Sequence, residues 1–177
     1  AALAAASERG RAADADALLA MAALVTRGDA RAPDVAVIAW RKAIDLLLRK
    51  PSPDYSQLAS AYRNLIDLSL SSMDESGALA ACREATRAAA SARSEDTWPS
   101  EELEWLAVRS WNYGVGARVM GRDCTAKDWQ GAAIAVVERS SVLEARFGDS
   151  MRSHYMDLLS ELGQDAAATN AAAPMET

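Results

Sequence analysis

The stretch RSWNYGVGARVMGRD, Arg109–Asp123, contains the residue types in this sequence that most resemble a ligand-binding loop. Closely spaced glycines, here Gly114, Gly116 and Gly121, can let backbone N–H groups approach a phosphate. The dinucleotide motif G-x-G-x-x-G, however, needs a glycine at position 119, where this chain has valine, and it follows a strand. We therefore expect Gly114 to lie where two helices pack closely, with Trp111 filling a neighbouring groove.

His154 is the only histidine, and a histidine oriented by a carboxylate can act as a general base. Asp157 follows three residues later on the same helical face, which is the arrangement expected of a small enzyme built around His154. The chain has no G-x-S-x-G nucleophile elbow that would place a serine beside this pair. We expect His154 to be a surface residue, and the sequence predicts no catalytic site.

Two further groups have metal-binding or redox-active residue types. Glu101, Glu102 and Glu104 could hold a cation, but they fall at the start of an expected helix, where the helix dipole favours acidic side chains. Cys82 and Cys124 are far apart and form no C-x-x-C pair, which argues against a zinc site or a disulfide framework. We expect no metal and no cofactor, and an intracellular, reducing compartment, either cytoplasm or nucleus.

The elements that must position these residues are expected to be helices, because apolar residues recur at helical spacing and no segment has the pattern of a strand. Ser52, Asp74 and Thr125 are the expected caps of three of them. The expected helices cover residues 14–28, 33–50, 52–72, 74–93, 100–121, 125–148 and 150–163. Their short connections favour antiparallel pairs.

A repeated pattern of small and large residues runs through the second helix of each expected pair. Ala36, Trp40 and Ala43 have the same spacing as Ala78, Cys82 and Ala85, and Ala132 with Val136 repeats the first half. These are the offsets of a tetratricopeptide repeat (TPR), in which small residues let two helices approach and large ones fill the next groove. The residues expected in this packing are Trp40, Tyr62, Cys82, Trp105, Trp111, Gly114 and Trp129.

The sequence therefore predicts an all-α fold in which about seven helices form antiparallel hairpins, stacked as a short TPR-like α-solenoid. We expect this domain to cover residues 11–163, with flexible segments at 1–10 and 164–177. The chain has 177 residues, half of them hydrophobic, but only 6% are aromatic and many are alanine. Because alanine buries little area, stability is expected to depend on close helix approach and a few large side chains.

Charge and hydropathy exclude two classes of partner. The formal net charge of −6 argues against a non-specific nucleic-acid surface or binding to an anionic membrane. The longest apolar run, Ala17–Val25, is half the length of a membrane span, so no membrane insertion is expected. The chain begins without a methionine, which indicates a processed form or a piece of a longer protein.

The segment ELEWLAVRSWN, 102–112, with the turn Gly121–Asp123, resembles the carboxyl-terminal part of the meiotic sporulation/zipper scaffold family. In that family an E-W-L-A segment is followed by an aromatic-Asn pair, a glycine-acid turn and a further helix. The resemblance extends in helix order from Tyr55 to Leu159. It implies a non-enzymatic scaffold that gathers recombination and chromosome-axis proteins in the nucleus.

We expect a non-enzymatic protein–protein interaction module whose partner is a peptide or another subunit. Trp98 and Tyr155 fall outside the repeat positions, so they are expected to contact the partner, together with Arg41 and Arg49 on the basic half of the second helix. The alternative is a peripheral structural subunit of a large multi-protein assembly, cytoskeletal or organellar. Such a subunit would bury several broad surfaces, whereas a module would use a single groove.

Overall fold

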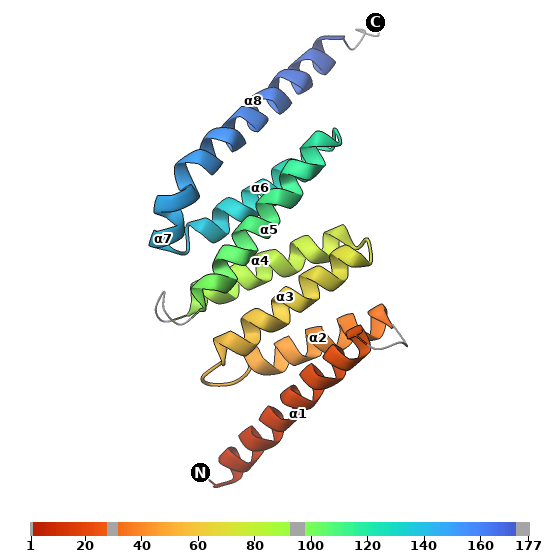
Figure 1. Cartoon of the computed structure of the whole chain (residues 1–177), viewed down its shortest axis with the longest axis vertical. Helices are drawn as coiled ribbons and strands as arrows, with labels where there is room; N and C mark the ends of the chain where they lie inside the picture. The colour runs from red at the N-terminus through yellow and green to blue at the C-terminus, as the bar shows by residue number, and fades with distance from the viewer. Residues whose placement is uncertain (1, 28–31, 93–97, 173–177) are drawn as a thin grey trace, which may run out of the picture. The chain divides into compact units, whose positions relative to one another are not determined.

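The computed structural model describes the backbone of residues 2–27, 32–92 and 98–172 and the side chains of 14–26, 32–92 and 98–163. Over these residues the protein is all-α: seven helices and no strand, when the last three helical elements are counted as one continuous run (Figure 1). Gly28, the expected end of the first helix, lies outside the described residues. The chain divides into two compact units, Ala1–Glu102 and Leu103–Thr177, where the sequence predicts one domain.

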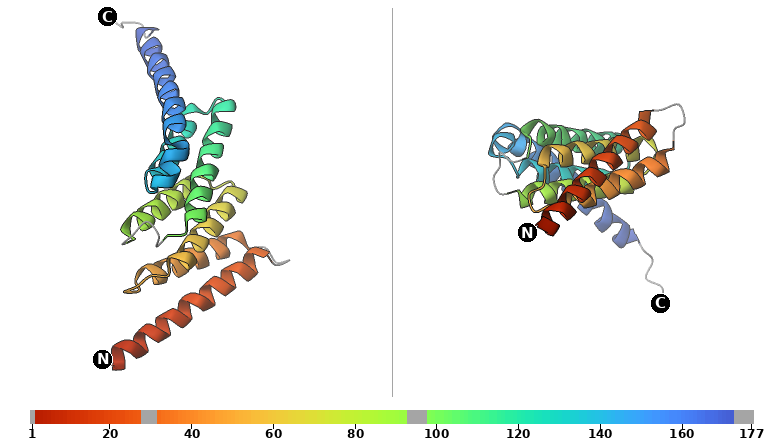
Figure 2. Two further views of the ribbon diagram at one scale, coloured as in Figure 1. Left: turned by 60° about the vertical axis from the view of Figure 1, so that its left-hand side comes forward. Right: turned by 90° about the horizontal axis from the view of Figure 1, so that it is seen from below.

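The first unit is built from α1 (Ala2–Arg27), α2 (Pro33–Leu48), α3 (Tyr55–Ser71) and α4 (Glu75–Ser91). Each of these helices packs antiparallel against the next one along the chain, as Figures 1 and 2 show. This order of pairing is consistent with hairpins stacked as in an α-solenoid. It brings α2, α3 and α4 together, and these three helices form the candidate site described below.

Aspartates begin two of these helices. The Asp54 carboxylate accepts hydrogen bonds from the backbone N–H groups of Ser56 and Gln57, at 3.0 and 3.1 Å. The expected cap at Ser52 is therefore wrong, and α3 begins at Tyr55. Asp74 caps α4 as expected and accepts from the N–H of Gly77 at 2.9 Å. Both caps satisfy donors that the first helical turn would otherwise leave unpaired.

The core of the first unit alternates small and large side chains. The small residues of the repeated pattern, Ala36, Ala43, Ala78 and Ala85, are all buried. Large side chains fill the spaces that these alanines leave between neighbouring helices, and those buried most completely are Leu47, Leu58, Leu65 and Ile66. Alanine lets the helix backbones approach, so much of the stabilising contact comes from backbone against side chain.

The second unit contains most of α5 (Ser100–Val119), followed by α6 (Asp123–Val137), α7 (Ser141–Leu143), the π-helical η2 (Glu144–Gly148) and α8 (Asp149–Ala172). Gly114 of α5 lies against α6. A Cβ added there would come within 2.7 Å of the Gln130 side chain and 3.1 Å of the carbonyl oxygen of Ala126. Gly114 therefore lies at the closest approach of two helices, with Tyr113 beside it on the buried Trp129 (ring centroids 4.6 Å apart).

Helix ends in the second unit differ from those expected. One helix over 125–148 is wrong: α6 begins at Asp123, ahead of Thr125, and ends at Val137. Ser140 then begins the next helical run, where its hydroxyl accepts from the N–H of Leu143 at 3.4 Å. Gly148 does not end a helix, because it lies inside that run, packed against the Glu144 side chain.

The two ends of the chain also differ from expectation. Helix α8 continues through Gly163 to Ala172, and α1 begins at Ala2. Helix is therefore present in both segments expected to be flexible, 1–10 and 164–177. Both are rich in alanine, which has the highest intrinsic helix propensity. Apolar periodicity, from which the helices were predicted, does not detect such alanine-rich segments.

Candidate functional site

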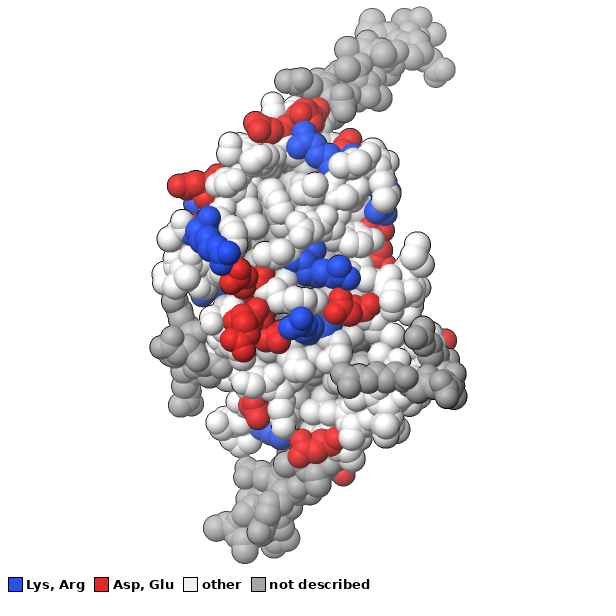
Figure 3. Space-filling model, in the orientation of Figure 1, with Lys and Arg blue, Asp and Glu red and all other residues white. Residues whose placement is uncertain are grey.

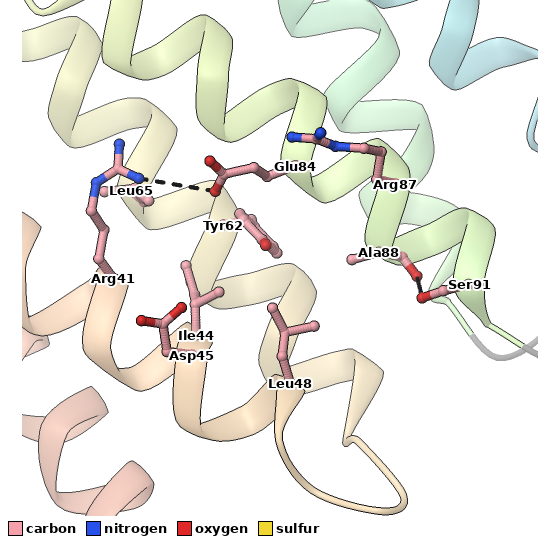
Figure 4. Close-up of a pocket in the computed structure, with 10 residues that line it drawn as sticks. All are labelled: Arg41, Ile44, Asp45, Leu48, Tyr62, Leu65, Glu84, Arg87, Ala88 and Ser91. Atoms are coloured by element: carbon pink, nitrogen blue, oxygen red, sulfur yellow. Dashed lines mark hydrogen bonds and ion pairs between the residues drawn. The ribbon is translucent and has the colours of Figure 1, made fainter.

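An open groove of about 500 Å³ lies in the first unit, between α2 and α4 with α3 beneath (Figure 4). This volume is in the range of pockets that bind small molecules or short peptide segments. Three helices line it: Arg41, Ile44, Asp45 and Leu48 from α2, Tyr62 and Leu65 from α3, and Glu84, Arg87, Ala88 and Ser91 from α4.

The spacing of these residues explains why they share one groove. On each of α2 and α4 the lining positions are three, four and seven residues apart, which places them on a single helical face. The two helices run in the same direction with α3 between them, so their lining residues correspond at a constant offset in the sequence. The parallel helices α2 and α4 thus form the two opposite walls of the groove.

The lower part of the groove is apolar. Ile44, Leu65 and Ala88 are buried, and Leu48 at the edge of the groove is 42% exposed. The Ser91 hydroxyl is occupied, because it donates a hydrogen bond to the carbonyl oxygen of Ala88 at 2.7 Å. An aliphatic side chain from a partner would cover this surface and remove it from water, which is the usual source of binding free energy in such a groove.

Charged side chains of both signs stand along the walls. Arg41 and Glu84 face each other across the groove, with Nη1 and Oε2 3.9 Å apart and the two side chains 41% and 37% exposed. Such an exposed, long ion pair contributes little to stability. Asp45 and Arg87 line the groove without an ion pair of their own among the described residues.

Tyr62 brings a hydroxyl group to the middle of the groove. The pKa of Tyr62 is raised to about 12, and burial is the largest cause. The negative charges of Glu84 and Asp45 also raise this pKa, by more than the positive charges of Arg87 and Arg41 lower it. The hydroxyl therefore keeps its proton throughout the neutral range and remains a hydrogen-bond donor. Because the hydroxyl is already protonated at neutral pH, it cannot accept a proton there, so this side chain is better suited to binding than to proton abstraction.

The residues expected to contact a partner lie in different environments. Arg41 is in the groove, whereas Arg49 is exposed just beyond the end of α2 and does not line it. The expectation for Trp98 is wrong: it is 3% exposed, because its ring packs against Tyr55 with centroids 6.1 Å apart. Tyr155 is half-buried and packs in the second unit against the cluster of Ala117, Ala126 and Leu158.

The residues expected in helix packing are buried to different extents. Trp40, Tyr62, Cys82, Gly114 and Trp129 are buried, and Trp40 Nε1 donates to the Thr26 hydroxyl at 3.5 Å. Trp105 and Trp111 are partly exposed. Tyr62 is both a packing residue and a groove residue, because its ring is part of the helix packing and its hydroxyl group lines the groove.

His154 is exposed on α8, with its ring edge-on to Trp111 and centroids 6.4 Å apart. Its Nδ1 donates to the carbonyl oxygen of Ser150 at 2.7 Å, which leaves Nε2 facing away as the acceptor. Among the described residues no carboxylate or hydroxyl group is hydrogen-bonded to this ring. The pairing with Asp157 that an enzyme site would need is not formed.

Asp45, Leu48, Glu84 and Arg87 were not singled out from the sequence. Each is an ordinary residue on a helix, and only the packing of α2 and α4 on α3 gives the four a common site. The repeat gives only a partial signal: aligning Ala36 with Ala78 pairs Asp45 with Arg87 but pairs neither Leu48 nor Glu84 with a lining residue. The repeat predicts the core face, and the groove lies on the adjacent face.

No protein-family model matches the chain, and no solved structure matches it. Within the described ranges no group of three or more histidine, cysteine, aspartate or glutamate side chains is arranged to hold a metal ion. None of the helices there has an apolar stretch long enough to cross a membrane. On the face drawn in Figure 3, acidic and basic side chains are interspersed.

Proposed function

We propose that this protein is a non-enzymatic protein–protein interaction module and that the groove between α2 and α4 holds a peptide segment of its partner. The observation that carries the proposal is the combination in one groove of an apolar floor, a hydroxyl donor and charged groups not engaged in strong ion pairs. Apolar burial supplies affinity to such a segment, and the polar groups fix its register. The groove alone supports this function, since residues 102–112, on which the resemblance to the meiotic scaffold family was based, do not line it.

The proposal is tested with the full-length chain and two matched variants on the same helix. Leu48→Lys places a charge on the apolar edge of the groove, and Ile38→Lys places the same charge on an exposed position that does not line the groove. Leu48 and Ile38 are 42% and 55% exposed, so neither change buries a charge in the core. We expect Leu48→Lys to abolish recovery of the partner by the tagged chain and Ile38→Lys to leave it unchanged. The reverse pattern would contradict the proposal.

A second candidate function is that of a peripheral structural subunit in a large assembly. It is favoured by large apolar side chains exposed in both units, including Leu24 and Ile38 in the first and Val119 and Met120 in the second. Contact with several neighbours would cover such dispersed positions. In that case Ile38→Lys or Val119→Lys would release the chain from its complex, and Leu48→Lys alone would not.

A further inference from the structure

We propose that the groove selects partner segments with a basic side chain, held between the carboxylates of Asp45 and Glu84 with its aliphatic stem along Ile44 and Leu48. The inference rests on the proposed function and names the chemistry of the ligand. Its occupant is an arginine or lysine in a peptide segment of another protein.

Two carboxylates face the groove from opposite walls. Asp45 comes from α2 and Glu84 from α4, and both act electrostatically on the Tyr62 hydroxyl in the same groove (Figure 4). Glu84 is engaged only by Arg41, 3.9 Å away and largely exposed, and Asp45 has no ion pair among the described residues. A cation from a partner would form charge-assisted hydrogen bonds with both carboxylates.

The groove also fits the stem of a long basic side chain. Arginine and lysine place their methylene groups on apolar surface while the charged head remains among polar groups. Ile44 and Leu48 supply that surface about one and two helical turns along α2 from Arg41, and Leu65 lies below them. An acidic residue has a shorter stem and would leave this surface uncovered.

The two arginines of the groove make an acidic ligand the competing possibility. Arg41 already faces Glu84, and Arg87 stands on the α4 wall. All four charged groups act on the Tyr62 hydroxyl, where the effects of Glu84 and Asp45 exceed those of Arg87 and Arg41. Beside that hydroxyl the two carboxylates therefore outweigh the two arginines, which favours a cation there.

The test uses pools of acetylated heptapeptides as the probe. The central residue is fixed as arginine, lysine, citrulline or glutamate, the other six positions are randomised, and binding to the full-length chain is measured by fluorescence polarisation. Citrulline keeps the shape of arginine without its charge. We expect the arginine pool to bind about tenfold more tightly than the citrulline pool, and we expect this preference to shrink as salt concentration rises.

Variants assign the preference to the two carboxylates. Asp45→Asn and Glu84→Gln are each expected to reduce the arginine preference severalfold, and Glu138→Gln, an exposed acid in the second unit, is the matched control. Equal binding of the arginine and citrulline pools, or tighter binding of the glutamate pool, would overturn this inference while leaving a peptide-binding groove in place. Failure of every pool to bind would also overturn it, whereas the groove itself is tested separately by Leu48→Lys.

Discussion

Tyr62 combines a structural and a binding role in one side chain, because its ring is buried between helices and its hydroxyl group lines the groove. The sequence predicts the first role from the repeat spacing. The second depends on Asp45 and Glu84, whose charges act on the hydroxyl from two other helices, and no local sequence pattern predicts that arrangement. The burial of the Tyr62 ring was therefore predictable from the sequence, whereas the charges around its hydroxyl group were not.

The titration of Tyr62 can be measured directly. Its pKa of about 12 in the folded chain exceeds the ordinary value of 10.0, so the unfolded chain loses this proton first as the pH rises. The stability that this difference contributes is complete below about pH 10 and is lost between about pH 10 and 12. We expect the phenolate absorbance that distinguishes wild type from Tyr62→Phe to appear with a midpoint near 12. A midpoint near 10 would show that the hydroxyl is fully solvated.

Gly114 and Gly116 form a matched pair within one helix. A Cβ at 114 would meet the Gln130 side chain and the α6 backbone, whereas a Cβ at 116 would meet nothing within 4 Å. We expect Gly114→Ala to lower the free energy of unfolding by about 1–3 kcal/mol through overpacking. Gly116→Ala should raise it by about 0.5–1 kcal/mol, because alanine is the better helix former. Urea denaturation measures both, and equal effects at the two positions would contradict the close α5–α6 contact.

Trp98 shows where residue-scale prediction failed. It lies outside the repeated pattern, and we took such an aromatic residue to be available to a partner. Its burial comes from Tyr55, the first residue of α3, which is far away in the sequence. A large aromatic side chain without a place in the pattern still finds apolar surface when the chain compacts.

At the scale of the element, helix existence was predicted well and helix ends were not. Apolar periodicity and prolines located α2, α3, α4 and α5, since tertiary packing requires a buried face on each helix. The ends depend on single hydrogen bonds, such as that to Ser140, and several serines and aspartates compete for that role in the sequence. Gly148 and Gly163 were both expected to end a helix, and both predictions are wrong because each residue lies inside a helical run.

Two residues, Asp54 and Ser52, are the alternative caps of α3, and each places the start of the helix at a different position. The structure assigns the cap to Asp54, which accepts two backbone hydrogen bonds, and the sequence had pointed to Ser52. We expect Asp54→Ala to lower the free energy of unfolding by about 1 kcal/mol and Ser52→Ala to have almost no effect. The comparison is made by urea denaturation of the two variants under the same conditions. A larger loss in Ser52→Ala would place the start of α3 earlier.

At the scale of the whole molecule, the chain folds as two compact units, and the candidate site belongs to the first. The boundary falls inside α5, where Glu102 accepts a hydrogen bond from Arg63 of α3 at 3.1 Å. Periodicity could not predict this division, since it identifies the buried face of each helix but not which distant helix covers it. The all-α class follows from local pattern, and the groove follows from long-range packing.

Photo-crosslinking from three positions tests the central claim, that the partner occupies the α2–α4 groove. Leu48 in the groove, Ile38 on the outer side of α2 and Val119 in the second unit are replaced one at a time by p-benzoyl-phenylalanine, in cells that naturally make the protein. Each of the three side chains is at least 42% exposed, so all three probes can react. The account predicts a strong crosslink to one partner from position 48 and weak or no adducts from 38 and 119. Adducts from 38 and 119 with none from 48 would contradict it and would favour a peripheral subunit.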